Sequence, residues 1–295
     1  MRKILRYLIG LAVLGAGVFW VLSRPVPLPD DATTGLTPDV QRGETVFWAG
    51  GCASCHAAPD AADDAKLILS GGYRMTSPFG TFVAPNISPG PKGIGDWSAQ
   101  DLANALIAGV SPSGRHLYPS LPYTTYARMD LQDVVDLKAF MDSLPVSNLD
   151  SQPHDLGFPF TVRRGLGLWK RINLSSDWVM TQAATPELER GRYLVEALGH
   201  CAECHTPRDV TGGLDRTRWM HGAPNPSGKG KIPAISPDQL TWSAGDIAYY
   251  LETGFTPDYD SAGGQMTKVV ASMAHLSAED RAAIAAYLKA LPPPR

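Results

Sequence analysis

Apolar side chains recur at intervals of three and four residues in separate segments of the chain, a spacing that predicts amphipathic helices. In the last segment, Ile284, Leu288 and Leu291 fall on one helical face, as packing against a core requires. Six such segments, bounded by turn residues, are predicted as helices: 38–49, 98–108, 131–144, 186–198, 243–253 and 278–291. Patterns typical of strands are few, so the expected fold class is all-α.

Capping residues mark the ends of the predicted helices. Thr37 and Thr185 are the expected N-caps of two helices in which a proline takes the first position. Ser98 and Ser243 are the expected N-caps of the second helix in each half of the chain. A glycine follows each of these second helices and is expected to end it.

The amino terminus is apolar and carries its charge only at its start. An uncharged run of 17 residues, from Tyr7 to Ser23, follows Arg2, Lys3 and Arg6. This length is at the lower end of what spans a bilayer as a helix, and a basic start with an apolar centre also resembles a signal peptide. No small-residue cleavage site follows the run, so residues 1–24 are predicted to be an uncleaved anchor, with a cleaved signal as the alternative.

The chain after residue 35 repeats itself. The string PNISP that begins at Pro85 matches PAISP at Pro233, and WSAQDLA from Trp97 matches WSAGDIA from Trp242. The offsets between the copies run from 145 to 149 residues, so the chain is interpreted as a duplicated domain. The predicted division is an anchor or signal peptide at 1–24, domains at 35–145 and 185–295, and an ordered, aromatic-rich strap at 146–184.

Length and charge narrow the classes of function. The 295 residues suffice for two ordinary domains. The net charge of −3 and the pI of about 6.2 provide no basic surface of the kind that nucleic-acid binding requires. The sequence contains no nucleotide-binding loop and no Ser/His/Asp set, so candidate chemistry is confined to the cysteines and their neighbours.

Every cysteine belongs to one of two C-x-x-C-H motifs. The motifs are Cys52-Ala53-Ser54-Cys55-His56 and Cys201-Ala202-Glu203-Cys204-His205. This spacing is the signature of c-type haem attachment: the two thiols add across the haem vinyl groups, and the histidine becomes an axial ligand of the iron. One motif in each copy therefore predicts two covalently bound haem c groups.

Zinc binding, a redox dithiol and disulfides are alternative uses of these cysteines. Four thiolates could complete a zinc tetrahedron, but zinc does not require a histidine directly after each second cysteine. A redox dithiol would sit at the end of a strand in a βαβ pattern, which is absent from the sequence. Disulfides are possible in an exported chain, although two residues between cysteines form a tight and reactive ring.

Longer strings resemble a known group of proteins. Gly93 to Ala103 reads GIGDWSAQDLA, His116 to Tyr123 reads HLYPSLPY, and Gly199 to Arg208 reads GHCAECHTPR. These strings are similar to the cytochrome c subunits of membrane-bound alcohol, aldehyde and sugar-acid dehydrogenases, and the short helical domains resemble class I cytochromes c. The resemblance covers nearly the whole chain after residue 35. It implies two tandem class I cytochrome c domains after an N-terminal transmembrane helix, although those subunits often carry three haems.

The resemblance also implies a methionine as the sixth iron ligand, because a soft thioether raises the reduction potential. Met266 lies in a Gly-rich loop ahead of the last helix, where the family places this ligand, and is assigned to the second haem. The related subunits have methionine where this chain has Leu121, which cannot bind iron. Met129 is the predicted ligand of the first haem, with Met75, His116 or an open iron as alternatives. Aromatic residues of both copies are candidates for lining the haems: Trp97, Tyr118, Tyr123, Trp242 and Tyr249.

The predicted function is electron transfer without catalysis. A membrane-anchored dihaem cytochrome c would pass single electrons between a dehydrogenase or quinol-linked donor and a respiratory acceptor. The expected partners are a dehydrogenase subunit, a cytochrome or terminal oxidase, and the membrane. The expected location is the bacterial cytoplasmic membrane, with the haem domains on the periplasmic side. The alternative is a haem enzyme, peroxidase-like or thiosulfate-oxidising, that uses an open or unusually ligated first haem.

Overall fold

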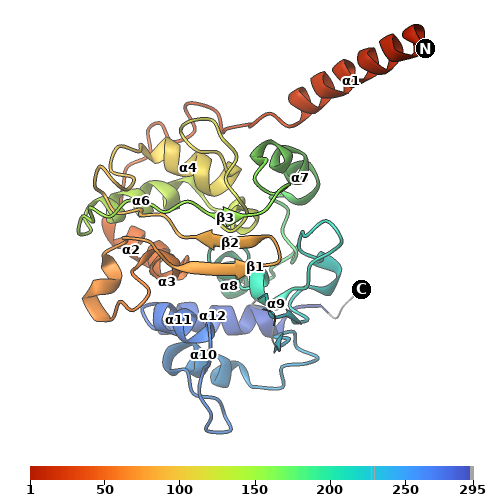
Figure 1. The fold of residues 1–295 in the computed structure, drawn as a ribbon. Coiled ribbons are helices and arrows are strands. Elements are labelled where there is room, and N and C mark those ends of the chain that lie inside the picture. The colour runs from red at the N-terminus through yellow and green to blue at the C-terminus, as the bar shows by residue number, and fades with distance from the viewer. Residues whose placement is uncertain (227, 229, 293–295) are drawn as a thin grey trace.

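The computed structural model describes residues 1–226, 228 and 230–292, and helices dominate it (Figure 1). Residues 227, 229 and 293–295 of the predicted second domain lie outside the described residues. The first half contains α1 (Arg2–Leu22), α2 (Val40–Ala49), α3 (Cys52–His56), α4 (Ala99–Ala108), α5 (Tyr123–Tyr126) and α6 (Leu131–Asp142). After α7 (Leu166–Asn173), the second half repeats the order from α2 to α6 as α8 (Pro186–Tyr193), α9 (Ala202–His205), α10 (Ala244–Thr253), α11 (Met266–Met273) and α12 (Ala278–Lys289). The predicted duplication of helical domains is confirmed.

Two small sheets accompany the helices. The antiparallel strands β1 (Arg74–Ser77), β2 (Gly80–Val83) and β3 (Asp155–Leu156) form one sheet, and β4 (Ala223–Pro224) pairs with β5 (Lys231–Ile232) in the other. These strands are two to four residues long, too short for an alternating pattern to reveal them. In the first sheet Thr81 pairs with Asp155, so the segment between the two copies is fastened to the first copy.

Each half is built on one close crossing of two helices. The first helix of each copy meets the last at a glycine: a Cβ added at Gly43 would lie 2.0 Å from the carbonyl oxygen of Asp136 on α6. A Cβ at Gly191 would lie 2.0 Å from the carbonyl oxygen of Ala283 on α12. Only glycine lets the two backbones approach this closely, so the crossing fixes the direction in which each attachment motif leaves its helix.

The helix caps confirm most of the sequence predictions. Ser98, Ser243 and Thr185 each accept a backbone N–H of the helix that they begin. The prediction for Thr37 is wrong, because α2 begins at Val40 and the carboxylate of Asp39 accepts a backbone N–H of its first turn at 3.1 Å. Aspartate is an effective N-cap, and its position leaves the preceding proline outside the helix.

The helix α1 extends away from the rest of the molecule (Figure 1). An 18-residue window within its 21 residues has a mean hydropathy of 2.0, and none of its residues is buried, so the helix is long and apolar enough to cross a membrane. The residues that follow it are held by the first domain and by α7. His116 Nε2 lies 2.8 Å from the carbonyl oxygen of Ser23, and Arg171 Nε donates to that of Leu22 at 2.6 Å.

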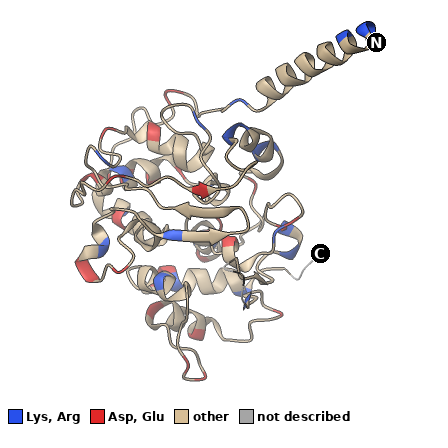
Figure 2. Ribbon diagram, in the orientation of Figure 1, with Lys and Arg blue, Asp and Glu red and all other residues tan. Residues whose placement is uncertain are grey.

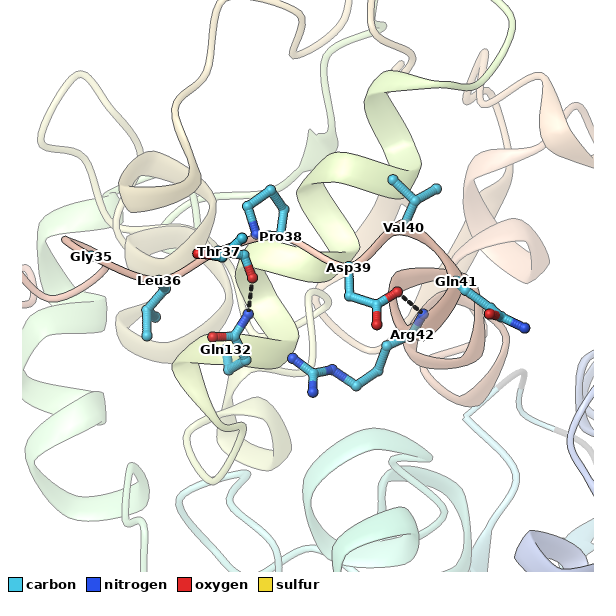
Figure 3. Close-up of a pocket in the computed structure, with 9 residues that line it drawn as sticks. All are labelled: Gly35, Leu36, Thr37, Pro38, Asp39, Val40, Gln41, Arg42 and Gln132. Atoms are coloured by element: carbon cyan, nitrogen blue, oxygen red, sulfur yellow. Dashed lines mark hydrogen bonds between the residues drawn. The ribbon is translucent and has the colours of Figure 1, made fainter.

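A groove of about 790 Å³ lies where the chain enters α2 (Figure 3). Residues 35–42 and Gln132 line it, and Gln132 Nε2 donates to the carbonyl oxygen of Thr37 at 2.7 Å. This end of α2 is a helix length, about 15 Å, from the end that leads to Cys52. The hydrogen bond fastens the entering chain to α6, and the groove lies outside the attachment motifs.

Candidate functional site

The two C-x-x-C-H motifs begin with the same sharp bend. The residue before the first cysteine has a positive φ in both copies: +61° at Gly51 and +40° at His200. After this bend Cys52 starts α3, while Cys201 caps α9. Glycine adopts a positive φ readily, whereas the histidine adopts it at some strain. In both copies the bend turns the chain from the long first helix into the motif.

Each motif histidine is oriented by a carbonyl group. His56 Nδ1 donates to the carbonyl oxygen of Pro85 over 2.9 Å, and His205 Nδ1 donates to that of Pro233 over 2.7 Å. A carbonyl oxygen can only accept, so the proton lies on Nδ1 and the lone pair of Nε2 is available to a metal. Burial lowers the pKa of both imidazoles more than these bonds raise it, which keeps the rings neutral.

A glycine draws the following loop against each motif. Gly71 N–H donates to the carbonyl oxygen of His56, and Gly222 N–H donates to that of His205, both over 2.7 Å. Their φ angles are +76° and +75°, and a Cβ on Gly71 would lie 2.5 Å from a backbone oxygen, that of Ala84. These positions require glycine, and the loop that they hold carries the proline whose carbonyl orients the histidine.

The cysteines are free thiols on half-buried residues. Burial raises the pKa of Cys52 and of Cys201 to about 12, so both are protonated at neutral pH. A redox dithiol and a zinc site both need a readily formed thiolate. Among the described residues, no three His, Cys, Asp or Glu side chains form a group that could hold a metal ion. The arrangement therefore does not form the zinc cluster considered from the sequence.

These residues fit a haem c group. Each copy offers two thiols that are bonded to nothing else, next to a neutral imidazole whose Nε2 is free to bind iron. In c-type attachment the sulfurs bond to the porphyrin edge rather than to the metal, so the cysteines need not converge as metal ligands. The absence of a cysteine cluster in the described structure agrees with this use.

The third residue of each motif contacts the other domain. Ser54 Oγ lies 3.3 Å from the carbonyl oxygen of Lys268 and 3.3 Å from Ser272 Oγ, both on α11. Glu203 Oε1 accepts a hydrogen bond of 2.7 Å from Thr124 Oγ1 on α5. Since α5 and α11 hold the same place in the two copies, the contacts are related by an approximate two-fold axis. The two attachment motifs therefore meet at one interface.

Further side chains close this interface. Trp48 and His275 stack with ring centroids 3.7 Å apart and planes 3° from parallel. Lys268 Nζ donates to the carbonyl oxygen of Ser54 at 3.3 Å and lies 3.8 Å from the centroid of the Tyr73 ring. A positive charge from the second domain is thus placed on the backbone of the first attachment motif.

The two motifs also interact electrostatically. The pKa of Cys204 is raised chiefly by burial and then by nearby Glu203, with a smaller contribution from Cys55 of the other motif. Cys55 in turn is buried and faces the positive charge of Lys268. Cys55 of the first motif thus contributes, as the smallest of these influences, to the electrostatic surroundings of Cys204 in the second.

The candidate methionines occupy different environments. Met266 begins α11 and is half-buried. Met129 lies in the hydrophobic core, and its N–H donates to the carbonyl oxygen of Tyr126 at 2.9 Å. In the second copy Leu276 occupies the matching place, equally buried and directly before the last helix. The structure therefore gives Met129 the packing position of a leucine.

The alternative ligands of the first site are held elsewhere. His116 is buried, and its Nε2 bonds the carbonyl of Ser23, so this nitrogen fastens the segment after α1. Met75 is half-buried on β1, where it pairs with Phe82 of β2. Leu121 is half-buried just ahead of α5. His116 is therefore engaged through Nε2, which leaves Met75 as the alternative ligand with a sulfur atom.

Sequence reasoning placed Pro85 and Pro233 beside the iron's histidine or a haem edge, and the structure puts their carbonyls on the two histidines, but it missed the residues that join the two motifs. The repeated strings around Pro85 and Pro233 were the signal for the histidine-orienting carbonyls, because a fixed spacing after both motifs points to a shared contact. The contacts of Ser54 and Glu203 had no comparable signal. These two residues differ between the copies, and the partners that they contact lie far away in sequence.

Comparison with known proteins agrees with the geometry. The family model described as cytochrome c matches residues 40–145 and again residues 188–292. A diheme cytochrome c-type protein of Cereibacter sphaeroides is 57% identical over 294 residues, 99% of each chain. The fructose dehydrogenase cytochrome subunit of Gluconobacter japonicus is 33% identical and is matched over 91% of this chain. The gluconate 2-dehydrogenase cytochrome c subunit of Pantoea cypripedii is 36% identical over 93% of this chain.

The relatives differ in length. The chain spans the whole of the Cereibacter protein apart from about 1%, but 56% of the fructose dehydrogenase subunit and 64% of the gluconate dehydrogenase subunit. The similarity thus covers both copies of the repeat in each case, while the dehydrogenase subunits contain further sequence.

Proposed function

The chain belongs to the cytochrome c family, and we propose that it is a membrane-anchored carrier of single electrons between a dehydrogenase or quinol-linked donor and a respiratory acceptor. It carries two haem c groups, one in each cytochrome c domain. Each haem supplies an iron that gains and loses one electron, and the protein sets its potential through ligands, burial and hydrogen bonds. The relatives are a cytochrome and cytochrome subunits, which favours electron transfer over the haem-enzyme alternative.

In this proposal the two domains occupy residues 35–145 and 185–295, and the strap of 146–184 lies between them. The thiols that hold the haems are Cys52, Cys55, Cys201 and Cys204. His56 and His205 are the proximal ligands, and the Pro85 and Pro233 carbonyls hold their rings in the orientation that presents Nε2 to iron. Met266 is the sixth ligand in the second domain. Met129 is the sixth ligand proposed for the first domain, although its side chain lies in the core at the position that Leu276 fills in the second.

The meeting of the two motifs at one interface is the observation that carries the proposal. Ser54 and Glu203 each reach from a motif to the other domain, and Lys268 of the second domain donates to the carbonyl oxygen of Ser54. A protein that catalyses a reaction at one haem needs a substrate cavity, whereas a carrier needs its two redox groups close together. The placement of the motifs serves the second requirement.

The membrane anchor and the partners complete the proposal. The helix α1 spans the cytoplasmic membrane with Arg2, Lys3 and Arg6 on the inside, so both haem domains face the periplasm. Because relatives are cytochrome subunits of dehydrogenases, we infer that a dehydrogenase subunit delivers the electrons. A cytochrome or terminal oxidase removes them, and the chain itself is no enzyme.

Exposure of the purified full-length protein to carbon monoxide and cyanide tests this function. The expected result is reversible reduction of both haems, with no spectral change when carbon monoxide meets the ferrous protein or cyanide meets the ferric protein. A Met266→Ala variant serves as the positive control, because it opens the second site to added ligands. Ligand binding by the first haem, together with turnover of peroxide or thiosulfate, would establish a haem enzyme instead.

A further inference from the structure

The turn after α10 has the same backbone as the turn after α4. Thr256 N–H donates to the carbonyl oxygen of Asp260 at 2.8 Å, as Ser111 N–H donates to that of Arg115 at 2.9 Å. Both turns are closed by an isolated antiparallel bridge, which in the first copy joins Val110 to its partner six residues later. Residues 145 positions apart are therefore structural equivalents in this region, and their surroundings can be compared directly.

In the first copy this surface is covered by the chain itself. Asn104 Oδ1 accepts the N–H of Leu28, from the segment after α1, at 2.8 Å. Lys170 Nζ, from α7, donates to the last carbonyl of α4 at 2.7 Å and to the carbonyl of its glycine cap at 2.6 Å. The cation satisfies carbonyl groups at the negative end of the helix dipole. Val110 is consequently only 3% exposed.

In the second copy the equivalent surface is open. Tyr249 takes the place of Asn104 and is 55% exposed, although the sequence placed it among candidates for lining a haem. Phe255 takes the place of Val110 and is 53% exposed. A groove of about 420 Å³ runs between the helix and the turn. The residues that line it are Asp246, Tyr249, Phe255, Thr256, Pro257 and Tyr259.

Tyr259 is held in a strained conformation with its ring in solvent. Its φ is +63°, and its equivalent in the first copy is Gly114, with a φ of +69°. A left-handed backbone suits glycine and disfavours a residue with a side chain. The tyrosine is nevertheless 97% exposed, so no intramolecular packing compensates for the strain. Amphipathic aromatic side chains in such positions are typical of binding surfaces.

The charge of the turn is reversed between the copies. Asp258 and Asp260 replace Ser113 and Arg115, and both aspartates are exposed. Figure 2 shows further acidic positions on the neighbouring α10. By contrast α7, which covers the equivalent surface of the first copy, carries basic residues and contacts that surface through Lys170. An aromatic groove beside the carboxyl end of a helix, with the exposed carboxylates of Asp258 and Asp260 in the adjoining turn, is complementary to a segment of that kind.

We propose that this groove of the second domain is the docking surface for a redox partner protein that presents a basic helix with a lysine beside apolar side chains. The lysine would bind the carbonyl end of α10, as Lys170 binds that of α4, and the apolar side chains would pack on Phe255 and Tyr259. This inference rests on the proposed electron-transfer function, because the turn leads directly to Met266. In Figure 1 this surface lies at the end of the molecule away from α1, so the partner approaches from the aqueous side.

The test exchanges the turn of the second copy for that of the first. The triple variant Asp258→Ser, Tyr259→Gly, Asp260→Arg is made in the full-length protein, whose backbone already accepts this sequence at the equivalent turn. The probe is a strongly basic, soluble, single-haem cytochrome c, and its binding is measured by calorimetry at low ionic strength. The variant is expected to bind about tenfold or more weakly, with a smaller dependence on salt, and Tyr259→Gly alone about threefold more weakly.

Two controls separate this inference from the proposed function. Val210→Ser removes an equally exposed apolar side chain from a loop of the same domain outside the groove, and should leave binding unchanged. Every variant should exchange electrons with a small neutral mediator at the wild-type rate. Equal binding of the probe by the wild type and the triple variant would overturn the docking surface, as would an equal loss in Val210→Ser. Failure of the wild type to exchange electrons even with the mediator would overturn the proposed function instead.

Discussion

The first cytochrome c domain is covered, and the second is open. The segment after α1, together with α7, closes the end of α4, whereas the equivalent end of α10 carries exposed Phe255 and Tyr259. The two domains otherwise share their helix crossings, their histidine-orienting carbonyls and their loop glycines. The residues that position each attachment motif are thus equivalent in the two domains, whereas the surface at the end of α4 and of α10 differs. The first domain packs against the segment that follows α1, and the second leaves the equivalent surface exposed.

Removal of the thiols of one motif should produce the largest difference between the two domains, the loss of one haem and not of the other. The double variant Cys201→Ser, Cys204→Ser should lose the second haem and keep the first, because each site uses only its own motif for attachment. Cys52→Ser, Cys55→Ser should do the reverse. Mass spectrometry of the denatured chains should show one bound haem in each variant. A single variant that loses both haems would contradict independent attachment.

Substitution of the glycine at each helix crossing tests whether the two crossings contribute equally to the free energy of unfolding. Gly43→Ala and Gly191→Ala would each force a methyl group against a backbone oxygen 2.0 Å away, so both should lower the free energy of unfolding by about 2–3 kcal/mol. Gly245→Ala on α10 is the control, since its nearest neighbour is 3.7 Å away, and it should leave stability unchanged or slightly raised. Denaturant unfolding measures all three. Little effect from either crossing variant would mean that the helices can move apart.

Leucine substitutions compare the sixth ligands. Met266→Leu and Met129→Leu should each abolish the charge-transfer absorption of one methionine-ligated ferric haem and lower its potential. Met129→Leu should fold normally, because Leu276 fills the matching position of the second domain. Visible absorption spectra and redox titration of the two variants show whether each methionine binds its iron. An unchanged spectrum in Met129→Leu would show that this methionine only packs, and Met75→Leu would then be the variant to measure.

Loss of one charge at the interface should change the first haem more than the second. Lys268→Gln removes the cation that bonds the carbonyl of Ser54, so the ferrous state of the first haem should be disfavoured about threefold. This corresponds to a potential lower by about 30 mV, since tenfold is 59 mV for one electron. Lys289→Gln is the matched control, because its Nζ bonds two carbonyls within the second domain. An equal shift of the first haem's potential in Lys268→Gln and in Lys289→Gln would show that the effect does not come from the bond to Ser54.

The smallest expected effect is a dependence of the free energy of unfolding on pH. It comes from His275, which stacks on Trp48. Burial lowers the pKa of His275, helped by Lys66 and opposed by Glu44. Below about pH 6.5 the unfolded chain therefore binds a proton that the folded chain excludes, and stability should fall as the pH drops towards the folded pKa. Thermal unfolding of His275→Phe, which keeps an aromatic ring on Trp48, should show a flatter profile between pH 7 and 5. An unchanged profile would remove His275 as the cause.

The helices and the attachment motifs could be predicted because their signals are local. The spacing of Cys201, Cys204 and His205, and the caps at Ser98 and Ser243, involve residues a few positions apart. The short strands could not, because two to four residues show no alternating pattern. The interface contacts and the covering of the first domain could not, because they join residues distant in sequence. Thr37 shows a different limit: Asp39, two residues further along and directly before the helix, is also a good capping residue and is the cap.

The alkaline pyridine haem spectrum of the denatured full-length protein is the most direct test that each chain holds two covalently attached haem groups. After extraction with acidified organic solvent only covalently attached haem stays with the chain, so the spectrum then counts the haems held by the two motifs. The structure and its dihaem relative predict two haem c groups per chain. Haem that extracts into acidified organic solvent, or fewer than two haem c groups per wild-type chain, would contradict the account of two attachment sites in two domains.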